Sequence, residues 1–279
     1  MAKGIISQLN AGGSGGSILI TESNGAAPAP TGGAPTAGDT GMGAGTGTVS
    51  PGTGAPALNS GSSISFTETL SGINEGDLVS FDISSDAATG STLAVNISKL
   101  ASGTVVSGSA SGEVIVAPGE AALITGATVN GKIKAGAGST LVMQGANTAM
   151  DKIEGRGCSL VLIIGGTTAK KKGDIKDSEI IVILDNKETF EDKLKIKRCQ
   201  QVLVDENHIM GELEIEECQD VMVTGNTVDK EIEVEDSANA IVTGNTVGGD
   251  LELENVTTWT VENNTVGGET KINEEEDHD

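Results

Sequence analysis

The chain has 279 residues, which is enough for one long solenoid or two modest domains. It contains 40 Gly, one Trp, three Phe and no Tyr, which excludes a bulky aromatic core and favours a narrow interior of β-branched side chains. The net charge is −23: residues 1–150 hold nine acids and four lysines (−5), and residues 151–279 hold 31 acids and 13 bases (−18). Such an acidic C-terminal half repels phosphate backbones, so we expect no nucleic-acid partner.

The N-terminus carries no secretory signal pattern, and the chain has no apolar run long enough to cross a bilayer. Its three cysteines are too few for a disulfide scaffold, and we expect them to be small buried apolar side chains: Cys158, Cys199 and Cys218. The sequence therefore predicts cytoplasmic synthesis without a signal peptide, and no membrane partner.

Residues 1–100 contain three segments with a shared resemblance. They are MAKG at the N-terminus, EGDLVSF at 75–81 and AVNIS at 94–98. Together with Asn10, Gly16 and Ile18, they resemble the strands of a cold-shock domain. The resemblance implies a small OB-like barrel over residues 1–100, interrupted by an insertion at about 26–62.

The same region departs from that family where the family binds single strands. Aromatic side chains on the first strands supply about 1–3 kcal/mol of stacking per base in such proteins. Here the equivalent places are glycine and serine at 13–17, then Ile64, Ser65, Phe66 and Thr67, so only Phe66 keeps an aromatic ring. We expect nucleic-acid binding to be lost and the module to serve in docking.

The insertion at about 26–62 is rich in Gly, Ala, Pro and Thr. This composition buries too little apolar surface to fold alone. We interpret it as a strap that lies against a neighbouring molecule.

From Val202 the chain repeats every 19 residues, in segments that start at Val202, Val221, Ala240 and Trp259. Within each segment apolar and polar residues alternate, which indicates short strands. One asparagine recurs in register in all four segments, and it is expected to bond to its counterpart in the next coil: Asn207, Asn226, Asn245 and Asn264.

The repeat continues upstream less regularly. Val114 and Ile133 are 19 residues apart, as are Gly119 and Gly138, whereas residues 165–192 contain small insertions. The predicted fold class is therefore all-β: an OB-like barrel, then a single-stranded-solenoid parallel β-helix over 101–279. We expect eight or nine coils between about 104 and 273, followed by an acidic tail.

Outward positions of the repeat carry acids in three registers. The predicted columns are Glu212, Glu231, Asp250 and Glu269; Glu214, Glu233 and Glu252; and Glu216, Glu235 and Glu254. Stacked carboxylates repel one another, and carboxylate oxygens are ligands that Ca²⁺ prefers. The first two columns are the candidate divalent-cation site, with Ca²⁺ as the one possible cofactor. A solvated face and a surface for a basic partner are the alternatives.

The middle coils are instead basic, at Lys170, Lys171, Lys172, Lys193, Lys195, Lys197 and Arg198. A solvated face with local ion pairs would explain them. The alternative is self-association, in which the basic middle of one molecule contacts the acidic end of another.

Many β-helices cleave polysaccharides, and such sites need paired carboxylates and aromatic platforms for sugars. Only Trp259 could be a platform here. The sequence thus predicts no enzyme but a structural or interaction protein that forms homo-oligomers with protein partners, by analogy a phage capsid decoration or fibre in the virion. The alternatives are a bactofilin-like cytoskeletal filament and a carbohydrate-binding or depolymerising surface protein.

Overall fold

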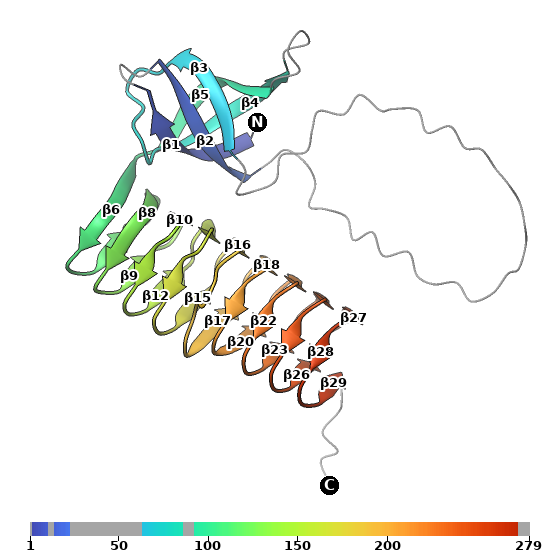
Figure 1. Cartoon of the computed structure of the whole chain (residues 1–279). Helices are drawn as coiled ribbons and strands as arrows, with labels where there is room; N and C mark the ends of the chain where they lie inside the picture. The colour runs from blue at the N-terminus through green and yellow to red at the C-terminus, as the bar shows by residue number, and fades with distance from the viewer. Residues whose placement is uncertain (1, 11–13, 23–62, 86–91, 273–279) are drawn as a thin grey trace, which may run out of the picture.

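The computed structural model describes residues 2–10, 14–22, 63–85 and 92–272, and every regular element in these ranges is a β-strand. Figure 1 shows a small barrel followed by a long stack of coils. The predicted all-β fold class is therefore confirmed. The predicted strap at 26–62 and the acidic tail from 273 lie outside the described residues.

The barrel closes in the strand order β1-β2-β3-β5-β4, and β4 pairs back with β1. The neighbours are antiparallel except for β3 and β5, which are parallel. Its core is filled by aliphatic side chains with Phe66 and Phe81. The strands are β1 (Ala2–Leu9), β2 (Ser14–Glu22), β3 (Ser63–Thr69), β4 (Leu78–Ser85) and β5 (Thr92–Ala101).

The solenoid has three outer faces, each a parallel sheet that adds strands coil by coil. We name the sheets after one member. The β10 sheet contains β8 (Ala121–Val129), β10 (Thr140–Gln144), β13 (Leu160–Ile164), β16 (Ile180–Leu184), β18 (Gln201–Asp205), β21 (Asp220–Thr224), β24 (Asn239–Thr243) and β27 (Thr258–Glu262). Three further strands join it through β8: β6 (Gly103–Ala110), β11 (Thr148–Ala149) and β14 (Thr168–Ala169).

The β17 sheet has nine strands, about one for each coil. They are β7 (Val114–Val116), β9 (Ile133–Ala135), β12 (Ile153–Arg156), β15 (Gly173–Lys176), β17 (Lys193–Lys197), β20 (Glu212–Glu216), β23 (Ile232–Glu235), β26 (Leu251–Glu254) and β29 (Thr270–Ile272). The short β22 sheet contains β19 (His208–Ile209), β22 (Thr227–Val228), β25 (Thr246–Val247) and β28 (Thr265–Val266).

The coil length is not uniform. Val202 pairs with Val221, and the period that this pair defines continues unchanged to β27. In the middle coils the pairing exceeds that period, by one residue where Leu141 pairs with Val161 and by two where Ile181 pairs with Val202. The expected repeat therefore holds at both ends of the solenoid and not in the middle. The longer coils include corner residues at positive φ, among them Gly165, Gly166, Glu188 and Phe190.

Phe190 shows how a longer coil is accommodated. Its side chain is fully buried in the solenoid core. Gly173 lies beside it, and a Cβ atom at that glycine would meet the Phe190 ring at 2.7 Å. A large side chain in one coil is thus matched by a missing side chain in the neighbouring coil, which keeps the interior closely packed.

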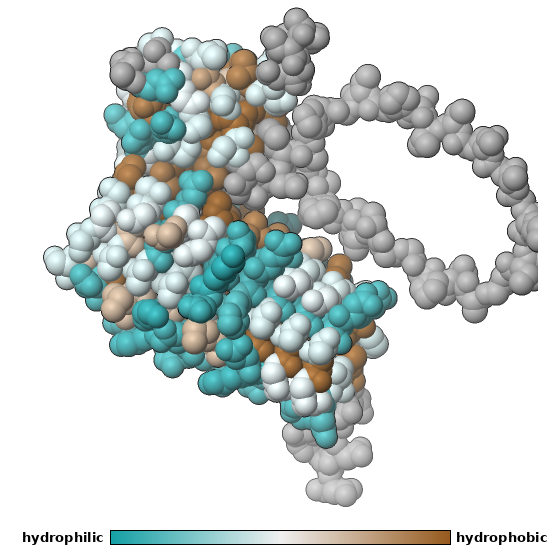
Figure 2. Space-filling view, in the orientation of Figure 1, coloured by the Kyte–Doolittle hydropathy of each residue, from teal (hydrophilic) through white to brown (hydrophobic). Residues whose placement is uncertain are grey.

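The barrel is fixed to the solenoid by an apolar cluster. Ile5 and Leu19, on the outside of the barrel, share a buried cluster with Leu123, Val142 and Leu162 of the β10 sheet. Figure 2 shows apolar colour where the barrel meets the coils. The two parts therefore share a continuous dry contact and not only a linking peptide.

Asp77 makes polar contacts where the barrel meets the solenoid. Its carboxylate is buried, accepts the backbone N–H groups of Asn74 (2.7 Å) and Gly103 (2.9 Å), and pairs with Lys99 at 2.7 Å. Burial alone would raise the pKa of Asp77, but Lys99 and these two N–H groups outweigh it and lower the pKa. The charged carboxylate thus ties the barrel to Gly103, where β6 begins.

Candidate functional site

Two buried ladders line the interior corners of the solenoid. In the first, Asn226 donates from Nδ2 to the Val204 carbonyl (2.8 Å) and to Oδ1 of Asn245 (3.1 Å). Its own Oδ1 accepts from the backbone N–H of Asn207 at 2.9 Å. The expected asparagine ladder is confirmed, and it continues upstream through Asn186, Thr167 and Asn147.

In the four C-terminal repeats the left-handed backbone angle falls one residue before the ladder asparagine. Glu206, Gly225, Gly244 and Asn263 have φ values between 55° and 68°, whereas the ladder asparagines are not among the residues with positive φ. The asparagine thus serves as a hydrogen-bonding residue, and the residue before it makes the bend.

A second ladder at the opposite corner contains the cysteines. The Cys199 N–H donates to Sγ of Cys218 (3.3 Å), and the Cys218 N–H donates to Oγ of Ser237 (3.2 Å). Upstream the same ladder includes Ser139, Cys158 and Ser178. All three cysteines are free and buried, as expected, so they serve as small interior side chains.

The outer face of the β17 sheet carries most of the candidate residues, in three parallel columns that we name the charged face. Its central column runs Lys134, Glu154, Asp174, Lys195, Glu214, Glu233, Glu252 and Lys271. The N-terminal flanking column runs Lys132, Lys152, Lys172, Lys193, Glu212, Glu231, Asp250 and Glu269. The C-terminal flanking column runs Arg156, Lys176, Lys197, Glu216, Glu235 and Glu254.

The charge reverses sharply between β17 and β20. Over β9, β12, β15 and β17, the columns hold nine basic and two acidic side chains, a net charge of +7. Over β20, β23 and β26, they hold nine acidic side chains and no basic one, a net charge of −9. The predicted acidic columns are present, and each continues upstream into a basic or mixed column.

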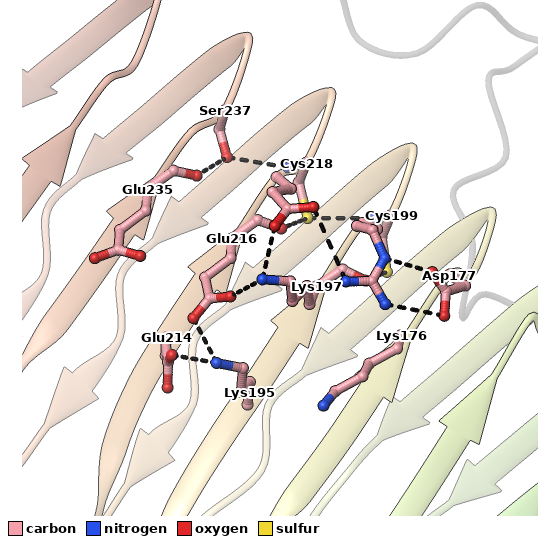
Figure 3. A network of polar contacts seen from close by, with 12 residues as sticks. Lys176, Asp177, Lys195, Lys197, Cys199, Glu214, Glu216, Cys218, Glu235 and Ser237 are labelled. Carbon is pink, nitrogen blue, oxygen red and sulfur yellow. Dashed lines mark hydrogen bonds and ion pairs between the residues drawn. The ribbon is translucent and has the colours of Figure 1, made fainter.

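At this boundary the opposite charges pair within the chain (Figure 3). Lys195 bridges Glu214 (2.5 Å) and Glu216, and Lys197 contacts Glu216 at 2.5 Å and Glu217 at 2.7 Å. Hydrogen bonding to Glu214 and these two lysines lower the pKa of Glu216 to about 2, against the opposing effect of burial. The largely buried Glu216 carboxylate is therefore held in its charged form, and lysines of the preceding coil pair with both Glu214 and Glu216.

One coil further the carboxylates lose their partners. Glu231, Glu233 and Glu235 of the β23 coil have no ion pair with any described residue. Burial, followed by the neighbouring carboxylates Glu235, Glu214 and Glu231, raises the pKa of Glu233 to about 7. In the basic half, Lys132, Lys172 and Arg156 likewise have no ion pair within the described part of the chain.

The acidic columns do not converge. Within residues 2–10, 14–22, 63–85 and 92–272, no three His, Cys, Asp or Glu side chains are gathered as a metal ion requires. The ladder of Glu212, Glu231, Asp250, Glu269, Glu214, Glu233 and Glu252 is therefore a flat array rather than a cage. Cation binding there stays a prediction.

A second surface feature was not expected from the sequence. The middle outward position of the β10 sheet is apolar in seven successive strands, which we name the apolar row: Leu123, Val142, Leu162, Val182, Leu203, Met222 and Ile241. Its first four members are buried in the cluster that includes Ile5 and Leu19 of the barrel, and its last three are partly exposed. The register of Leu203, Met222 and Ile241 in the C-terminal repeat was a signal that could have found it.

The aromatic residues are not arranged as a binding platform. Phe66 is 2 % exposed and lies in the barrel core, so it presents no face to a base. Trp259 is 44 % exposed at the C-terminal end of the solenoid, where it pairs with the buried Ala240. An open hollow of about 250 Å³ beside Ile115 and Lys134 contains a single carboxylate, Glu154.

The described residues include no helix that is long and apolar enough to span a membrane. No protein-family profile, no curated protein and no solved structure matches this chain.

Proposed function

We propose that this protein is a non-catalytic structural protein that works within an oligomeric assembly. The observation that carries the proposal is the apolar row on the β10 sheet, which continues past the barrel over Leu203, Met222 and Ile241. The outward positions of the neighbouring β17 sheet are charged in the same coils. A solvated sheet favours polar residues outward, so three aligned apolar side chains indicate a covered surface.

The occupant that we propose is a second copy of the chain. In the molecule itself, the outside of the barrel already covers the first part of the row through Ile5 and Leu19. A contact between copies would extend this dry interface along the same sheet. Because it is apolar, its strength should change little with salt.

The barrel is the proposed docking module. Its likeness to a cold-shock domain supports an OB-like ancestry, but the buried Phe66 and the absence of other aromatics on its first strands argue against base stacking. The proposal includes no nucleic-acid and no membrane partner. A stiff solenoid with a docking module fixed at one end suits a capsid decoration or fibre, so we propose a virion as the assembly.

One observation favours a filament as the second candidate. Trp259 occupies an inward column of the last described coils and is still 44 % exposed. Its apolar ring is therefore uncovered at the C-terminal end of the solenoid. End-to-end stacking of solenoids, as in a bactofilin-like filament, would bury it. Negative-stain microscopy separates the two candidates, because only the second predicts long unbranched filaments.

The proposed function is tested by solution mass. In 0.5 M NaCl, light scattering on a sizing column should give a multiple of the 28.0 kDa chain mass. The double variant Met222→Glu/Ile241→Glu should be monomeric, because it places charge in the apolar row. The matched control Thr227→Glu/Thr246→Glu makes the same charge change at exposed positions of the β22 sheet and should keep the wild-type mass. A wild-type monomer at 100 µM would refute the proposal.

A further inference from the structure

The two flanking columns of the charged face reverse their charge about the line between β17 and β20. The central column does not, because Lys134 mirrors Lys271 and the acids Glu154 and Asp174 mirror acids of β26 and β23. The N-terminal flanking column reads four lysines and then four acids, and the C-terminal flanking column reads three bases and then three acids. The seven strands from β9 to β26 span about 30 Å along the solenoid at about 4.8 Å per coil. The face is thus a long surface with a net charge of +7 on one half and −9 on the other.

This segregation does not serve the single molecule. A sheet that alternated Lys and Glu from coil to coil would place opposite charges beside each other at every step. Along each flanking column opposite charges meet only at one boundary, and elsewhere like charges stack at coil spacing and repel one another. Burial, and after it the neighbouring carboxylates, raise the pKa of Glu233 within the acidic half. A partner with the reverse pattern would relieve the repulsion.

We propose that the charged face binds the same face of a second copy in antiparallel orientation, about a two-fold axis parallel to the strands and between β17 and β20. This operation sets β15 against the partner's β23 and β12 against its β26. In the flanking columns, Lys172 then faces the partner's Glu231, and Lys132 faces the partner's Glu269. Arg156 faces the partner's Glu254.

A two-fold contact of this kind is self-complementary, because each copy offers the same pairs in both directions. Lys132, Lys172, Arg156, Glu231 and Glu254 have no ion pair within the described chain, so they are available for it. The only acids in the basic half, Glu154 and Asp174, are neutralised in place by Lys152 and Lys176. In the flanking columns a parallel arrangement would set like charges against like, so these columns select the antiparallel one.

This interface goes beyond the proposed function, since it lies on a different sheet from the apolar row and responds differently to salt. Ion pairs at a surface are screened over about 10 Å at 0.1 M salt. Sedimentation velocity in 20 mM salt should therefore show an association that disappears in 0.5 M salt. If the apolar-row contact did not form, the salt-sensitive association through the charged face would still be observed in 20 mM salt.

The decisive experiment uses two charge-reversal variants of unpaired residues. Lys132→Glu/Lys172→Glu makes the flanking column mostly acidic, and Glu231→Lys/Glu269→Lys makes it mostly basic. Each variant alone should lose the low-salt association, with the dissociation constant weakened at least tenfold. An equimolar mixture should form a heterodimer at least as tight as the wild-type pair, because the reversed columns complement each other.

The control Lys170→Glu/Lys187→Glu makes the same net charge change as Lys132→Glu/Lys172→Glu, but away from this face, and should associate like the wild type. Carbodiimide should also yield a Lys172–Glu231 amide, which three coil steps of about 14 Å prevent within one chain. The proposal is overturned if the wild-type mass in low salt equals that in 0.5 M salt. It is also overturned if either variant associates normally, or if the mixture does not form heterodimers.

Discussion

The two halves of the solenoid share an interior and differ in their exterior. Between β10 and β18 the coils are longer by one or two residues, and the charged face up to β17 is basic. From β18 onward the coils keep one constant period and the face is acidic. Both halves nevertheless keep the same two buried ladders and the same inward aliphatic columns. The stacking requirement therefore constrains the interior, and the outer faces are free to specialise.

The difference also explains where corner insertions are tolerated. The extra residues of the longer coils are accommodated at corners, while the paired positions of the strands stay in register. A corner can lengthen because its backbone groups face water or the neighbouring corner, whereas an extra residue within a strand would turn the inward side chains outward.

The largest expected effect on stability is at the asparagine ladder, which both halves of the solenoid share. Asn226→Leu should lower the free energy of unfolding by about 2–5 kcal/mol, because the Val204 carbonyl and the Asn207 N–H lose their partners inside the core. Chemical denaturation measures it. Asn264→Leu, in the last described coil, should cost clearly less because that side chain is only partly buried. Equal losses of unfolding free energy at the two positions would contradict the claim that the ladder stabilises the fold because its side chains are buried.

The second largest effect on stability is expected at the boundary between β17 and β20. Lys195→Met keeps the side-chain volume but removes the cation that bridges Glu214 and Glu216, which are 7 % and 8 % exposed. We expect a loss of about 1–3 kcal/mol in urea unfolding, since two buried carboxylates lose charge-assisted bonds. Lys134→Met, whose partner Glu113 is exposed, is the matched control and should cost under about 1 kcal/mol.

The third prediction concerns the left-handed corner position, which holds glycine in some coils and another residue type in others. Gly225 has a φ of 63°, and Glu206 occupies the same place one coil earlier with a φ of 55°. Gly225→Ala should cost about 1 kcal/mol of unfolding free energy, because a Cβ is strained in this region. Gly225→Asn should cost less, since asparagine tolerates left-handed angles. If both variants matched the wild type, the bend would not depend on backbone strain.

The smallest effect concerns the acidic half alone. The folded-state pKa of Glu233 is about 7, above its ordinary value of 4.5, so the folded chain holds this proton more tightly than the unfolded chain. Its contribution to stability is full below about pH 4.5 and is lost as the pH rises through 7. In 0.5 M salt, Glu233→Gln should melt higher than the wild type at pH 8 by a few degrees and nearly equal to it at pH 5. A constant difference across that range would show that Glu233 does not titrate as argued.

The sequence predicted the parts of the fold that depend on repetition. Asn207, Asn226 and Asn245 recur at one constant spacing, so the strands and the first ladder could be read directly. The second ladder was missed, because its positions hold both cysteine and serine, as at Cys218 and Ser237, so no single residue type marks it in the sequence.

The candidate surfaces were only half predictable. The acidic columns lie in the regular coils, but their continuation into Lys172 and Lys152 is shifted by the longer coils, so the reversal of charge along one column was hidden. The apolar row was overlooked because residues such as Met222 lie between inward valines and read as part of the core pattern. Which side of a strand faces a partner depends on tertiary contacts that alternation alone does not encode.

The most direct test of a structural role is the mass of the full chain in solution, measured by light scattering in 20 mM and in 0.5 M NaCl. We predict an oligomer in high salt, held by the apolar row, and a larger species in low salt, where the charged faces also pair. A 28.0 kDa monomer under both conditions at 100 µM would contradict the account.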